Sequence, residues 1–246
     1  MELYRLIHSK LRDISEFITR NKIVFIIGSL SICVAYILPS SQRSEKKGSK
    51  TPNLSYIEKL LENAENSTVY IQCAATSPEQ KAVKFYGTGI IIDKKEGLIL
   101  TCRHCIVHKF SDRWYKDFYG KYERKAPSVL MAGMAHSIRV TRGGASIPAH
   151  VLHLSPDPDI DLALIKCSSP DFDNEIKVND FTEATPLKKG TDIWMIGCPK
   201  GEIGSRDKML YNQVVGNNIN STGEVKEGWS GSVIMDPEGR PIGMMH

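Results

Sequence analysis

Short apolar runs separated by turn residues dominate the chain after residue 65. They are rich in Val, Ile and Leu, they end at Gly, Pro or Asp, and helical periodicity is scarce among them. Such runs are typical of an all-β sandwich or barrel. The pattern predicts strands over residues 68–73, 85–92, 98–101, 137–141, 147–154, 162–167, 192–197, 209–215, 232–235 and 241–245. A polar connection at residues 168–189 divides these strands into two halves.

The first 53 residues follow other patterns. Residues 1–22 carry apolar side chains three to four positions apart, which predicts an amphipathic helix. Residues 23–39 contain no charged side chain and predict a transmembrane signal anchor, although a signal-peptide core is also consistent with their length. Residues 40–53 have the composition of a linker, and residues 54–65 predict a short helix that leads into the domain.

Composition narrows the classes of function. An apolar share of 41% is enough for a core, and a net charge of +4 does not by itself indicate a nucleic-acid partner. In residues 109–125, six basic side chains interleave with six aromatic ones. The favoured interpretation is a loop whose aromatic side chains pack on the barrel. Contact with a membrane or a partner is the second alternative, and binding of single-stranded nucleic acid is the third.

Six cysteines are present, and Cys33 lies in the apolar segment, which leaves an odd number for the domain. Cys102 and Cys105 form a C-x-x-C pair, but no second pair with zinc spacing follows. Buried free thiols are therefore favoured, and no metal or organic cofactor is expected.

Three separate stretches carry candidate chemistry. In residues 228–232, glycines flank Ser230, so that the backbone can turn tightly and present the hydroxyl in a cleft. His104 follows one apolar run and Asp161 precedes another. Each residue alone has an ordinary structural explanation, but the chain order His, Asp, Ser is one of those known for catalytic triads. Asp157 and Asp159 are alternatives for the acid.

The ordered set of motifs resembles trypsin-like serine proteases, especially the HtrA/Deg-like branch. The matching stretches are residues 87–93, 97–104, 138–149, 161–166, 190–201, 228–232 and 239–243. The resemblance implies two antiparallel β-barrels of the six-stranded, chymotrypsin-like type, over about residues 66–168 and 186–246, within a protease domain at 54–246. An active site in the crevice between the barrels is implied as well.

The sequence also departs from the family pattern. Gly231 is followed by Ser232 where the family usually has a second glycine. Cys105 stands beside the histidine, as in many secreted members, but the corresponding place on the preceding strand, near Tyr86, has no cysteine. Family members continue past the position of His246, so that either the second barrel is open or the chain is incomplete.

The resemblance assigns roles to individual residues. Ser230 would be the nucleophile, His104 the general base and Asp161 the group that orients the histidine. The backbone N–H groups of Gly228 and Ser230 would form the oxyanion hole.

Two further residues are candidates for the substrate pocket. Glu224 lies six residues before the serine, near the base of the S1 pocket in trypsin-like enzymes. Met245 stands beside His246, in a run that resembles the Gly-x-His pocket wall of chymotrypsin-like viral proteases.

We therefore expect a single-pass membrane protein with a serine endopeptidase domain on the extracytoplasmic side, acting on protein or peptide substrates. Residues 23–39 would anchor it, nucleic acid is not an expected partner, and a homo-oligomer is compatible with the sequence. Two alternatives stay open. One is a protease-fold domain that binds without cutting, and the other is a viral-type protease that processes a polyprotein.

Overall fold

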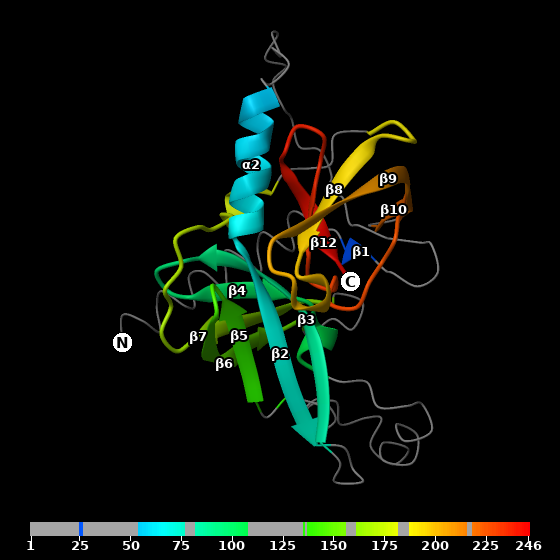
Figure 1. Ribbon diagram of the computed structural model, residues 1–246. Helices are drawn as coiled ribbons and strands as arrows, with labels where there is room; N and C mark the ends of the chain where they lie inside the picture. The colour runs from blue at the N-terminus through cyan, green and yellow to red at the C-terminus, as the bar shows by residue number, and fades with distance from the viewer. Residues whose placement is uncertain are drawn as a thin grey trace, which may run out of the picture.

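A computed structural model describes residues 25–26, 54–76, 82–107, 135, 137–155, 161–181, 187–215 and 218–246. Strands dominate this part of the chain and form two barrel-like sheets that lie beside each other (Figure 1). The sequence prediction of an all-β, double-barrel architecture is confirmed at this level.

The first barrel is closed. Its strands follow the order β2-β3-β4-β7-β6-β5, and β5 pairs back onto β2. Alternate side chains point inward and make an apolar core that includes Val69, Ile99 and Ile165, each fully buried. The strands are β2 (Thr68–Thr76), β3 (Ala82–Asp93), β4 (Leu98–Thr101), β5 (Ser137–Arg142), β6 (Ala145–Leu154) and β7 (Ala163–Cys167).

The second sheet has five antiparallel strands in the order β10-β9-β8-β11-β12. The two-residue β1 (Phe25–Ile26) pairs in parallel with both β10 and β12 and so joins the two edges. Trp229 is 1% exposed and belongs to the core that this sheet encloses. The remaining strands are β8 (Asp192–Gly197), β9 (Ser205–Val215), β10 (Asn218–Thr222), β11 (Val233–Met235) and β12 (Pro241–Met245).

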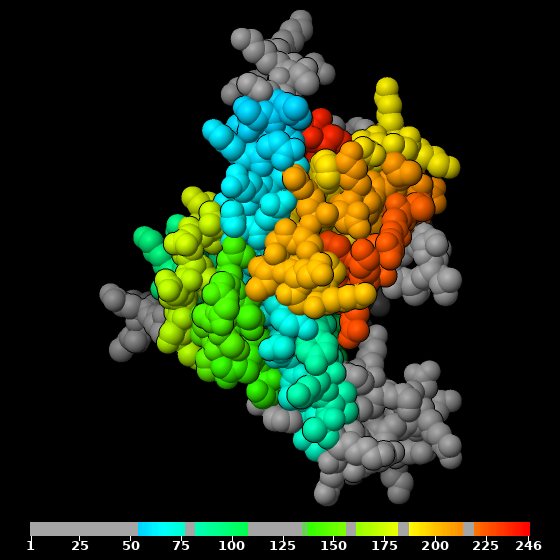
Figure 2. Space-filling model, viewed as in Figure 1, coloured from blue at the N-terminus to red at the C-terminus, as the bar shows by residue number. Residues whose placement is uncertain are grey.

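Helix α2 (Leu54–Asn66) spans the predicted helical segment and contacts both sheets (Figures 1 and 2). Its buried residues Leu61 and Ala64 belong to a core cluster that also contains Leu98 of the first barrel and Val233 of the second sheet. Glu58 and Glu65 of the helix both form ion pairs with Arg206 of β9, at 3.0 Å. The helix therefore helps to hold the two sheets together along their seam.

Most predictions for the N-terminal region concern residues outside the described part of the chain. These are the amphipathic helix at 1–22, the linker at 40–53 and all of the anchor at 23–39 except Phe25–Ile26, which form β1. Among the described residues, no helix has the length and apolar character needed to cross a membrane. The basic and aromatic segment at 109–125 also lies outside the described residues.

Three 3-10 turns complete the described elements: η1 (Arg103–Cys105), η2 (Val178–Asp180) and η3 (Pro199–Gly201). The first of these turns follows β4 directly and carries His104. It therefore determines where the candidate base lies relative to β7.

Candidate functional site

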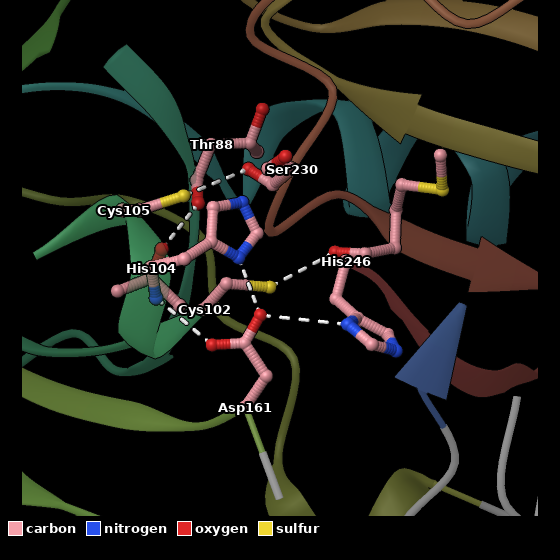
Figure 3. A network of polar contacts seen from close by, with 9 residues as sticks. Thr88, Cys102, His104, Cys105, Asp161, Ser230 and His246 are labelled. Carbon is pink, nitrogen blue, oxygen red and sulfur yellow. Dashed lines mark hydrogen bonds and ion pairs between the residues drawn. The ribbon is translucent and has the colours of Figure 1, made fainter. Parts of the chain in front are cut away.

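His104 and Asp161 are brought together by two adjacent strands. β4 pairs with β7 so that Thr101 lies opposite Ala163. His104 lies in the turn after β4, and Asp161 lies just before β7. Asp161 Oδ2 binds His104 Nδ1, and Asp161 Oδ1 accepts a hydrogen bond of 2.8 Å from the His104 backbone N–H (Figure 3). The carboxylate is therefore oriented by the backbone as well as by the imidazole.

The electrostatics of this pair favour a charged carboxylate. Burial raises the pKa of Asp161, but hydrogen bonds from His104 and His246 outweigh burial and hold that pKa well below its usual range. Burial also disfavours the protonated form of His104, whereas the neighbouring Cys105 and the Asp161 carboxylate favour it, so that its pKa is raised. An ionised carboxylate in contact with the imidazole stabilises the imidazolium that forms when a histidine accepts a proton.

Ser230 lies in a turn that two glycines permit. Gly228 and Gly231 have φ values of +93° and +91°, which side chains other than glycine rarely adopt. The turn is held by a hydrogen bond from the Ser232 N–H to the Trp229 carbonyl, at 2.9 Å, and by one from the Gly231 N–H to the Met245 carbonyl, at 2.7 Å. Figure 3 shows Ser230 on the side of the His104 ring opposite Asp161.

The backbone amides of Gly228 and Ser230 are the candidate oxyanion hole. Within the described part of the chain, the N–H groups of Gly228 and Ser230 donate no hydrogen bond. In the same part, no hydrogen bond joins the Ser230 hydroxyl to His104. Catalytic hydrogen bonds are often long without substrate and shorten in the complex, so this arrangement is compatible with a nucleophile and base.

Thr88 joins the serine turn to the first barrel. This fully buried residue of β3 donates its N–H to the Ser230 carbonyl at 2.7 Å. Its Oγ1 donates to the Gly228 carbonyl at 2.7 Å and accepts the Cys198 N–H at 2.8 Å. Nothing in the strand pattern marked Thr88 as different from its neighbours, because its partners come from the other half of the chain.

Replacing Thr88 by valine should destabilise the protein at this junction. Valine keeps the shape but leaves the Gly228 carbonyl and the Cys198 N–H buried without their partner, at about 1–3 kcal/mol for each orphaned group. We expect a lower free energy of unfolding in denaturant titrations, with little change in Thr88→Ser, which retains the hydroxyl. Equal stability of Thr88→Val and the natural protein would contradict this role.

The five cysteines that the structure describes are free and buried. The residue that faces Cys105 on the preceding strand is Gly87, where a Cβ atom would overlap the Cys105 sulfur. Glycine here makes room for the free thiol, which points toward the Ser230 carbonyl at 3.6 Å. Cys102 is fully buried, and its thiol donates to the Met245 carbonyl at 3.0 Å.

The candidate pocket residues lie in different surroundings. The Glu224 side chain is 73% exposed and forms an ion pair with Lys226 at 3.6 Å, while Met245 is buried in the core of the second sheet. The pocket role of Glu224 and Met245 stays a prediction. The alternative acids Asp157 and Asp159 lie outside the described residues.

The sequence analysis did not identify the contact between His246 and Asp161. His246 Nδ1 lies 3.4 Å from Asp161 Oδ2, the same oxygen that His104 Nδ1 contacts (Figure 3). A ligand atom from each of Cys102, His104 and Asp161 also lies within 4.8 Å of the other two. These side chains could hold a metal ion, although the cysteine spacing did not indicate one.

Comparison with known proteins supplies one match. The family model described as a trypsin-like peptidase domain matches residues 87–244, which include His104, Asp161 and Ser230. A comparison with curated proteins found no significant match.

Proposed function

The chain belongs to the trypsin-like peptidase domain family, and from this premise we propose that it is a serine endopeptidase with His104, Asp161 and Ser230 as its triad. A peptidase domain implies protein or peptide substrates. The observation that carries the proposal is that Asp161 binds His104 twice, at Nδ1 and at the backbone N–H. Ser230 lies on the other side of the imidazole ring.

The proposed roles follow from the chemistry of each group. Serine is a weak nucleophile at its own pKa and needs an adjacent base. His104 takes the proton of Ser230 as the hydroxyl attacks the carbonyl carbon and forms a tetrahedral intermediate. His104 then passes that proton to the leaving amine as the C–N bond breaks, which gives the acyl-enzyme. Asp161 keeps the proton of the neutral imidazole on Nδ1 and stabilises the imidazolium that forms. Water then attacks the acyl-enzyme by the same route.

The oxyanion hole is proposed at the N–H groups of Gly228 and Ser230. Both groups lack a partner within the described chain, which is what a preorganised donor pair requires. The bond from Thr88 to the Gly228 carbonyl supports this assignment, because it orients the peptide units around the serine.

The cellular setting is proposed from the sequence alone. The uncharged composition of residues 23–39 is the basis for a single membrane anchor, and the anchor would require Phe25–Ile26 to leave β1. We place the peptidase domain on the extracytoplasmic side. Membership of the HtrA/Deg-like branch rests on the strand and serine motifs quoted above.

A fluorophosphonate probe tests the proposed function directly. Such probes react with a serine only when a base and an oxyanion hole assist, so we expect one adduct, at Ser230, in mass spectra of the digested full-length protein. Labelling should vanish in Ser230→Ala and slow by at least about 10³-fold in His104→Ala. Ser168→Ala, which removes an exposed hydroxyl of the first barrel, should be labelled as the natural protein is.

The outcomes separate peptidase from binding module. A folded protein that is labelled at Ser230 irrespective of His104 would remove His104 as the base. A folded protein that is not labelled would overturn the peptidase proposal and favour a protease-fold domain that binds without cutting.

A further inference from the structure

Four potential metal ligands converge at the candidate triad and include two of its members. A ligand atom from each of Cys102, His104 and Asp161 lies within 4.8 Å of the other two. His246 Nδ1 lies 3.4 Å from Asp161 Oδ2. Figure 3 shows the Cys102 sulfur, the His104 ring nitrogen that faces Asp161, and the His246 ring around this carboxylate. From this arrangement we propose a zinc site formed by Cys102, His104 and Asp161, with His246 at the fourth position.

The donor set favours zinc over harder ions. Thiolate and imidazole ligands suit Zn²⁺, whereas Mg²⁺ and Ca²⁺ prefer oxygen ligands throughout. Zn²⁺ with one thiolate and one carboxylate is also neutral overall, which suits a site where the Cys102 side chain is fully buried. Binding releases the thiol proton to solvent, as the Cys102 sulfur exchanges its bond to the Met245 carbonyl for a bond to the metal.

The geometry needs only local adjustment. With bonds of about 2.0–2.3 Å, the ligand atoms of a tetrahedral zinc site lie roughly 3–4 Å apart. The His104 ring must move away from the Asp161 oxygen that it now binds, and the thiol must approach. Asp161 would stay in place, because its other oxygen accepts the His104 backbone N–H at 2.8 Å. A hydrogen bond of this kind holds a metal ligand in a fixed orientation.

Zinc at this site would switch the peptidase off, a consequence that rests on the proposed function. Coordination through Nδ1 leaves the imidazole proton on Nε2, which faces Ser230. A nitrogen that already carries a proton cannot accept the proton of the serine. The hydrogen bond from His104 to Asp161 is lost as well. The same side chains would thus serve either as a triad without metal or as a metal site without activity.

Cobalt reports the site without any assay of activity. We expect Co²⁺ added to the reduced full-length protein to give the near-ultraviolet thiolate-to-cobalt band and the visible bands of tetrahedral cobalt, and one equivalent of Zn²⁺ to remove them. Cys102→Ser should lose the thiolate band. His246→Gln removes the fourth ligand and should weaken binding by at least the roughly 10–100-fold that loss of a group supporting a ligand costs. Cys167→Ser, which removes a buried thiol of β7, is the matched control and should behave as the natural protein.

Absence of the thiolate band from the natural protein, or its persistence in Cys102→Ser, would overturn the site.

Inhibition is measured separately, as the rate of fluorophosphonate labelling. Saturating Zn²⁺ should reduce that rate at least about tenfold in the natural protein and in Cys167→Ser, and much less in Cys102→Ser. A protein that binds Co²⁺ through Cys102 but is labelled at the same rate with Zn²⁺ would overturn the inhibitory role. Binding through Cys102 without labelling under any condition would support the site and count against the proposed function alone.

Discussion

Asp161→Asn is expected to lower the rate of peptide hydrolysis by about 10⁴-fold, the loss found when an asparagine imposes the wrong imidazole tautomer on such a triad. The amide oxygen can still accept the His104 backbone N–H, while the amide NH₂ group faces His104 Nδ1. The imidazole proton then resides on Nε2, which can no longer accept the proton of Ser230. The negative charge that stabilises the imidazolium is lost as well.

The measurement is kcat/KM on a fluorogenic peptide, with the rate of fluorophosphonate labelling as a second readout. Asp171→Asn is the matched control, because this exposed carboxylate is close to Asp161 in the chain but lies outside the site. Circular dichroism shows whether each variant is folded. A folded Asp161→Asn protein that works within twofold of the natural rate would exclude Asp161 as the orienting acid.

Gly231→Ala is expected to have the largest effect on stability. Gly231 has φ +91°, and a Cβ atom there would overlap the Thr88 carbonyl oxygen and lie 2.9 Å from Thr101 Oγ1. Backbone strain of about 1–3 kcal/mol adds to a comparable steric term, so that the free energy of unfolding should fall by about 3 kcal/mol or more. Labelling at Ser230 should also fall, because the turn that presents the hydroxyl is displaced.

Gly144→Ala separates the two contributions. Gly144 has φ +81°, but a Cβ atom there would meet no described atom within 4 Å. This variant should therefore lose only the strain contribution, about 1–2 kcal/mol. Denaturant titrations of both variants give the comparison. If both variants lost the same free energy of unfolding, the close approach of Gly231 to Thr88 would contribute nothing to stability.

Local pattern was sufficient to predict much of the architecture. The β-strands around His104 and Asp161 follow from apolar runs bounded by turn residues, because alternation and turn chemistry are properties of neighbouring residues. The order of His104, Asp161 and Ser230, together with the glycines around the serine, was enough to nominate a site. The helix at Leu54–Asn66 could likewise be predicted from the spacing of its apolar residues.

Contacts between the two halves could not be predicted in this way. Thr88 resembles any strand threonine until the packing of the second sheet against the first barrel brings the serine turn to it. His246 follows an apolar strand, and only the pairing of β12 with β11 carries it to Asp161. Cys102 was read as one half of a C-x-x-C pair, whereas the structure groups it with His104 and Asp161.

The sequence by itself therefore determined the strands, their division into two halves and the chain order of the candidate triad, because each depends on residues that are close in the chain. Only the tertiary structure decided which distant groups meet: Asp161 with both His104 and His246, and Thr88 with the serine turn. The register of β4 against β7 and the packing of one sheet against the other set those distances. Neither is encoded in any single stretch of the chain.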